Sequence, residues 1–97
     1  MKLIDVTNSY PQLVTSQLEN TDSHLVRVYT VGKTNVIYSE APTHNEIVIQ
    51  NKNRKVKDSE INFVLDKLLP KHQGISKLNH IRTNHLVEIS IPVGAAS

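Results

Sequence analysis

Cysteine is absent from the chain, glycine occurs only three times, and aromatic residues make up only 4% of it. The absence of cysteine excludes disulfide bonds, thiolate metal centres and thiol catalysis. Three glycines leave little material for the backbone loops that stabilise oxyanions in acyl-transfer enzymes. No apolar run approaches the ~20 residues of a membrane-spanning helix, and the first residues lack the apolar stretch of a secretory signal. We therefore expect a cytoplasmic protein.

The 97 residues are enough for one compact domain and too few for two. Hydrophobic residues make up 38% of the chain and charged residues 21%, with a net charge of +2, which excludes a collagen-like or strongly disordered protein. Valine occurs 11 times and isoleucine 9 times, and these side chains suit a pleated sheet better than a helix. We expect a single α+β domain over residues 1–92, followed by a flexible tail at 93–97.

Hydropathy patterns divide the chain into seven elements. β-Branched and alternating runs predict strands over 3–6, 24–31, 36–38, 46–50 and 85–91, and apolar residues at helical spacing predict helices over 10–20 and 58–69. Asp58 is the expected N-cap of the second helix, and Pro70 ends it. The three-residue apolar spacing from Ile75 to Ile81 predicts one or two further helical turns.

The order β-α-β-β-β-α-β determines the expected architecture. It predicts an α+β two-layer sandwich, with a mainly antiparallel sheet and two amphipathic helices on one face. A ferredoxin-like fold with one added strand is the nearest familiar arrangement. We expect an edge strand, Val36–Tyr38 or Glu46–Ile49, to be free to pair with a partner strand.

Two segments, Met1–Tyr10 (MKLIDVTNSY) and Tyr38–Ile47 (YSEAPTHNEI), resemble an uncharacterised family of small proteins from low-GC Gram-positive bacteria. The resemblance covers nearly the whole chain. Because this family is a domain of unknown function, it implies no activity and no site residues. It implies a stand-alone cytoplasmic protein of bacterial origin.

Histidines and one glutamate are the candidates for a metal site: His44, Glu46, His80 and His85. Neutral imidazoles bind zinc and other divalent ions. The spacing matches no established motif, because two ligands on one helical face stand four residues apart and no carboxylate adjoins the later histidines. Solvated or hydrogen-bonded histidines are the favoured alternative, so we expect no metal and no cofactor.

The segment Pro42–Glu46, with Glu40 just before it, is the most polar stretch of the first half of the chain. A histidine flanked by carboxylates suits a general base. Proline, threonine and asparagine are also the residues with which a chain turns between strands, so we expect a loop here. No arrangement of serine, histidine and carboxylate supports nucleophilic catalysis, which makes an enzyme the less favoured interpretation.

The tripeptide Gly32-Lys33-Thr34 is similar to the end of a phosphate-binding loop. That motif requires a glycine where this chain has Arg27, and it requires a helix where this chain has a predicted strand. We therefore expect a hairpin turn and no nucleotide binding through this tripeptide.

Charge is distributed unevenly, with a net −2 over residues 1–50 and +4 over residues 51–97. The candidate anion- or nucleic-acid-binding residues are Lys52, Arg54, Lys55, Lys57, Lys71, Lys77 and Arg82. Such a set suits RNA phosphates. The small net charge and the scarcity of aromatics for base stacking count against a dedicated RNA-binding protein.

Three functions remain. We favour a non-enzymatic module that regulates or adapts through protein–protein contact, with itself as a homodimer or with another protein, and with no membrane partner. RNA binding through the basic residues is the alternative. A metal-assisted enzyme that uses His44, Glu46 and the later histidines ranks third.

Overall fold

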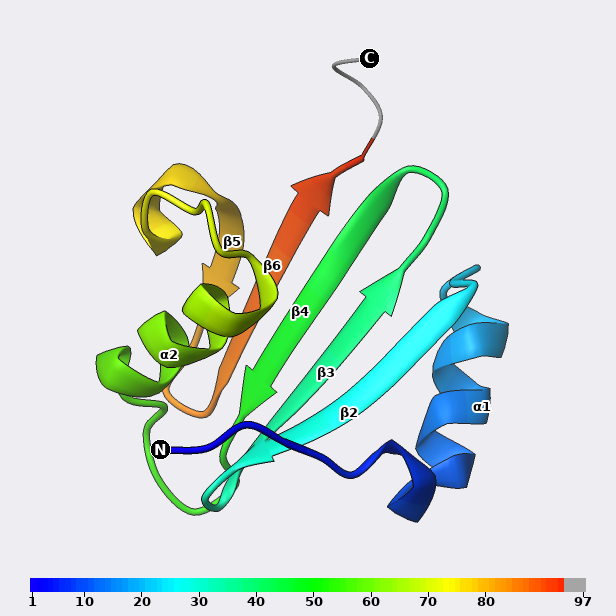
Figure 1. Cartoon of the computed structure of the whole chain (residues 1–97), viewed down its shortest axis with the longest axis horizontal. Helices are drawn as coiled ribbons and strands as arrows, with labels where there is room; N and C mark the ends of the chain where they lie inside the picture. The colour runs from blue at the N-terminus through cyan, green and yellow to red at the C-terminus, as the bar shows by residue number, and fades with distance from the viewer. Residues whose placement is uncertain (94–97) are drawn as a thin grey trace.

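A single antiparallel sheet organises the chain. The computed structural model describes residues 1–93. Its strands are β1 (Ile4–Asp5), β2 (Leu25–Val31), β3 (Thr34–Glu40), β4 (His44–Gln50), β5 (Asn79–Arg82) and β6 (Leu86–Pro92), and its helices are α1 (Pro11–Asn20) and α2 (Asp58–Leu68). Two 3-10 turns, Thr7–Ser9 and Ile75–Lys77, precede α1 and β5. The strands lie in the order β1-β2-β3-β4-β6-β5 (Figure 1).

The main core lies between α2 and one face of the sheet, called here the α2 face. Every second residue of the long strands points to this face, as strand geometry requires. The sheet contributes Val31, Val36, Ile47, Ile49, Val87 and Ile89, and α2 contributes Ile61, Val64 and Leu65, all at most 2% exposed. Burial of such side chains stabilises a fold by about 1.5–3 kcal/mol each.

The helix α1 covers part of the opposite face, called here the α1 face. Val26 and Val28 of β2 and Ile37 of β3 alternate with the residues of the main core, and all three are buried. The side of α1 that carries half-buried Leu13 and Val14 packs along β2. Because α1 lies along β2, at one end of the sheet, it leaves the α1 face of β4, β6 and β5 open.

The α+β class, the antiparallel sheet, the two helices and their order along the chain are confirmed. The helices differ from the expectation in position, because they lie on opposite faces of the sheet. The reason is visible in β2, where Val26 and Val28 are buried on one face while Val31 is buried on the other. A strand that is apolar on both faces needs cover on both.

Three local expectations need correction. The predicted helical turns after Ile75 form only one turn, after which Asn79–Arg82 continues as strand β5. The predicted loop Pro42–Glu46 is shorter, because β4 already begins at His44. The segments expected at a sheet edge, Val36–Tyr38 and Glu46–Ile49, lie in the central strands β3 and β4, and the edges are β1 and β5. Of the predicted tail, residues 94–97 lie outside the described residues.

The hairpin turn between β2 and β3 is confirmed. Val31 pairs with Thr34, which leaves a two-residue loop of Gly32 and Lys33. The φ of Gly32 is +59°, a left-handed value that glycine adopts more readily than residues with a Cβ atom. Tight two-residue hairpins commonly place glycine at this first loop position.

A buried polar network joins this hairpin to the start of α2. Glu60 is only 4% exposed, and its carboxylate accepts two hydrogen bonds of 2.9 Å from the Arg54 guanidinium. It also accepts bonds from the Thr34 hydroxyl at 2.6 Å and the Lys57 amide at 3.0 Å. Asn51, also buried, donates to the Thr34 hydroxyl. The expected N-cap Asp58 is wrong by one residue, because Lys57 occupies that position and Glu60 satisfies its amide.

These contacts change the acidity of Glu60. Hydrogen bonds from Arg54, reinforced by those from Thr34 and Lys57, outweigh the effect of burial and lower the pKa of Glu60 to about 2. Because the folded-state pKa lies below the unfolded value of 4.5, the stabilisation is fully present above pH 4.5. It is lost as the pH falls towards the folded-state pKa.

We predict that Glu60→Gln lowers the free energy of unfolding at pH 7 by about 2 kcal/mol, because the neutral amide of Gln, at this buried position, cannot pair with the charged Arg54 guanidinium as the carboxylate does. The difference from the wild type should shrink between pH 4.5 and pH 2. Urea unfolding followed by circular dichroism measures both effects. Glu19→Gln, at an exposed position of α1, is the matched control and should leave the free energy of unfolding unchanged. A constant difference across this pH range would contradict the assignment.

Candidate functional site: the open edge and face at β5

The structure gathers part of the predicted basic set around one hollow. Four of its residues, Arg54, Lys55, Lys57 and Arg82, line a hollow of about 400 Å³ beside the start of α2. Lys52, Lys71 and Lys77 do not line it. Two of the four cations already have carboxylate partners, because Arg54 is paired with Glu60 and Arg82 with Asp58 at 2.6 Å. Lys55 and Lys57 therefore carry the charge that is left for a ligand.

The histidines among the candidate metal ligands interact with different partners and not with one another. His44 is 3.8 Å from the Glu46 carboxylate, whereas His80 donates through Nδ1 to the Leu78 carbonyl at 3.0 Å. His85 donates through Nδ1 to the carbonyls of Asn51 and Arg54. Within residues 1–93, no three His, Asp or Glu side chains are grouped so that they could hold a metal ion.

The candidate group of His44 between the carboxylates of Glu40 and Glu46, considered beside the expected loop, does not form. Strand alternation puts Glu46 on the α1 face and Glu40 on the α2 face. Glu40 accepts a hydrogen bond from the Tyr38 hydroxyl, which also accepts one from Asn45 at 3.3 Å. Burial, followed by the bond to Glu40, raises the pKa of Tyr38 to about 12, so this phenol keeps its proton at neutral pH.

We predict that exhaustive chelation leaves the thermal unfolding midpoint unchanged, because the candidate ligands His80 and His85 bond to backbone carbonyls and His44 lies beside one carboxylate, with no shared ion. Calorimetry before and after dialysis against EDTA measures this. A midpoint that falls on chelation and recovers with added zinc would show a metal site instead.

The outer side of β5 has an open backbone edge. Thr83 donates to the Leu86 carbonyl at 2.8 Å, and hydrogen-bonded pairs alternate along an antiparallel ladder. Ile81 and Glu88 are therefore a bonded pair, and the amide and carbonyl groups of His80 and Arg82 point away from β6. Within the described part of the chain, no other segment bonds to these groups.

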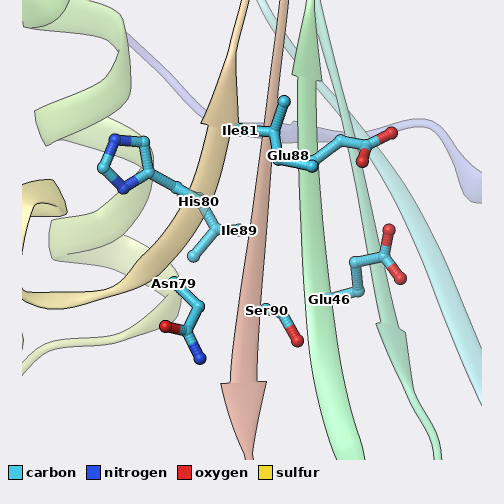
Figure 2. A pocket seen from close by; sticks show the side chains of 7 residues that line it. All are labelled: Glu46, Asn79, His80, Ile81, Glu88, Ile89 and Ser90. Atoms are coloured by element: carbon cyan, nitrogen blue, oxygen red, sulfur yellow. The ribbon is translucent and has the colours of Figure 1, made fainter.

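The open edge borders a hollow on each face of the sheet. On the α1 face a hollow of about 400 Å³ is lined by residues of three strands: Glu46, Asn79, His80, Ile81, Glu88, Ile89 and Ser90 (Figure 2). On the α2 face a hollow of about 300 Å³ lies among residues of α2, the turn before β5 and β5 itself: Asp58, Ile61, Asn62, Gly74, Ile75, Ser76 and Arg82. Ile81, at 64% exposure, is the most exposed large apolar side chain within any strand or helix that the structure describes.

Sequence reasoning missed β5 because its four residues are too few to show a period of two. Ile81 was the residue that could have indicated a strand here. It fits the helical spacing from Ile75, yet no apolar residue follows it on that helical face. The hairpin with β6 supplies the pairing partner that a four-residue strand needs.

The fold and this edge define a small protein built on one antiparallel sheet, with one helix on each face and with β1 and β5 as the edge strands of residues 1–93. Residues 1–92 match the model of a family described as a domain of unknown function, DUF1827, and the chain belongs to this family. The crystal structure of a conserved protein of unknown function from Streptococcus thermophilus LMG 18311 has the same fold. It is 39% identical, with a TM-score of 0.87 over 98% of this chain and 99% of that chain.

The resemblance to an uncharacterised bacterial family is thereby confirmed. No curated protein matches the chain significantly. Among the helices of residues 1–93, none is long and apolar enough to cross a membrane.

Proposed function

We propose that this protein is a non-enzymatic interaction module that binds an extended segment of a partner protein along β5. The observation that carries the proposal is the open edge of β5, where the amide and carbonyl groups of His80 and Arg82 face outward. An added strand satisfies such groups with main-chain hydrogen bonds, and hollows beside the strand bind its alternate side chains.

The surroundings of β5 support binding rather than protection of this edge. Edge strands that avoid partners are commonly very short, or carry charges, proline, bulges or a covering loop. Strand β5 is short and carries Arg82, but this charge is already paired with Asp58 and the strand contains no proline. All four residues of β5 are exposed, and Ile81 offers an apolar contact to an incoming side chain. One hollow lies on each face of the sheet, so the side chains that alternate between the two faces of an added strand would each find a hollow.

We predict that His80→Pro abolishes partner binding and leaves the fold intact. The His80 amide points away from β6, so proline removes an outward donor and fills the edge without removing a bond of the sheet. Wild-type and variant proteins are immobilised, and the proteins captured from an extract of the producing cells are quantified by mass spectrometry. Captured partners should fall at least tenfold with the variant.

The matched control for that experiment is Gln12→Pro, which introduces proline into the first turn of α1, where it is tolerated, far from β5 along the sheet order. Equal capture by His80→Pro and the wild type would contradict the proposal. Light scattering of the same proteins detects self-pairing through β5. In that case the wild type would have the mass of a dimer and His80→Pro the mass of a monomer.

The hollow beside the start of α2 favours RNA binding as a second candidate function. Lys55 and Lys57 both line this hollow, and neither forms an ion pair with a carboxylate within residues 1–93. RNA phosphates would replace counterions at these lysines, so affinity should depend steeply on salt.

We predict, for this second candidate, that a fluorescent single-stranded RNA binds at least tenfold more weakly at 200 mM than at 50 mM salt. The double variant Lys55→Glu/Lys57→Glu should lose most of the binding measured by anisotropy at 50 mM salt. Lys2→Glu/Lys33→Glu, which changes the net charge equally outside this hollow, should retain it. Binding that is absent, or equal for all three proteins, would exclude the RNA function.

A further inference from the structure

Three neighbouring strands, β5, β6 and β4, form the floor of the hollow on the α1 face, and their side chains surround it. The register places Asn79, Ser90 and Glu46 in one row across β5, β6 and β4, and Ile81, Glu88 and Val48 in the next row. Ser90 has the shortest side chain at the centre of this region. Figure 2 shows Ser90 between Asn79 on β5 and Glu46 on β4, with Ile81 and Glu88 one row further along the strands and both carboxylates on the side away from β5. The short serine therefore creates the hollow.

The groups around Ser90 accept hydrogen bonds and carry negative charge. Glu46 and Glu88 contribute two carboxylates, and Ser90 and Asn79 contribute neutral oxygens. Glu88 forms no ion pair or side-chain hydrogen bond within residues 1–93, and the partner of Glu46 there is His44 at 3.8 Å. Arg82, the cation of β5, points to the α2 face and binds Asp58. In a chain with a net charge of +2, this open surface is locally anionic.

An added strand at β5 brings its side chains to this surface. Strands in a sheet lie about 4.8 Å apart, so the backbone of the added strand lies about 10 Å from that of β6. A side chain opposite Asn79 points to the α1 face and extends over Asn79 towards Ser90. Extended lysine and arginine side chains reach about 6–7 Å from their Cα atoms, so the aliphatic part lies over Asn79 and the charged end meets the Glu88 carboxylate when that flexible side chain turns towards β5.

We propose that the segment bound at β5 is basic: an apolar residue lies against Ile81, and a lysine or arginine two positions away extends over Asn79 towards Ser90, where Glu88 and, at longer range, Glu46 attract its charge. This inference rests on the proposed strand addition and names the chemistry of its partner. The edge binds the segment through its backbone, and the two glutamates select it by charge.

The test uses three labelled heptapeptides with blocked ends. The lysine peptide is Thr-Lys-Thr-Val-Thr-Lys-Thr, and in the other two glutamine or glutamate replaces both lysines. The sequence is symmetric, so valine meets Ile81 and a lysine meets the hollow in either strand direction. Anisotropy titrations should show the wild type binding the lysine peptide about tenfold more tightly than the glutamine peptide, and the glutamate peptide most weakly.

The double variant Glu46→Gln/Glu88→Gln should bind the lysine peptide about tenfold more weakly than the wild type does and the glutamine peptide with unchanged affinity. Glu19→Gln/Asp22→Asn removes two charges elsewhere and should change neither affinity. Asparagine suits the latter position because Asp22 has a φ of +55°. Equal affinity of the wild type for the lysine and glutamine peptides, or no binding of the lysine peptide, would overturn the inference. Free spermidine that binds as tightly as the lysine peptide would also overturn it, in favour of a small-amine site.

The His80→Pro variant separates this inference from the proposed function. If the lysine and glutamine peptides bind equally and both are lost with His80→Pro, strand addition holds and the selection by charge fails. If binding of the lysine peptide is lost with Glu46→Gln/Glu88→Gln but kept with His80→Pro, the hollow binds cations without strand addition. The inference as stated then fails together with the proposed function.

Discussion

The ion pair of Glu60 with Arg54 holds together segments that are far apart in the chain. Through Glu60, the first residue of β3, the basic connection after β4 and the first turn of α2 meet at one buried carboxylate. A buried charge is costly unless it is fully paired, so this network specifies one position for α2 rather than merely adding stability. The position of α2 in turn decides which part of the sheet is covered.

Two short helices cannot cover both faces of a six-stranded sheet. The helix α2 lies over β4 and β6 on one face, and α1 lies along β2 on the other (Figure 1). The uncovered part of the α1 face coincides with the end of the sheet at which β5 has no neighbour. The open face and the open edge therefore lie side by side, which is why the proposed binding is placed at this end of the molecule rather than at the basic hollow.

Most of the fold could be predicted from the sequence, whereas the site could not. The long elements were predictable because their apolar residues repeat with a clear period, as in β6 and α2. The position of α1 was not, since its half-buried residues are equally consistent with either face of the sheet. The hollow at Ser90 was beyond sequence reasoning for a different reason. Glu46, Ser90 and Asn79 are far apart in the chain and meet only through strand register.

The brevity of β5 has a kinetic consequence. With only His80 and Arg82 presenting outward backbone groups, main-chain bonding to a partner is confined to a few bonds, and the burial that accompanies it is small. Differences in affinity among related complexes arise mostly from their rates of dissociation. A contact of this size exchanges rapidly, which makes the edge of β5 suited to sampling one partner after another rather than to holding a permanent assembly.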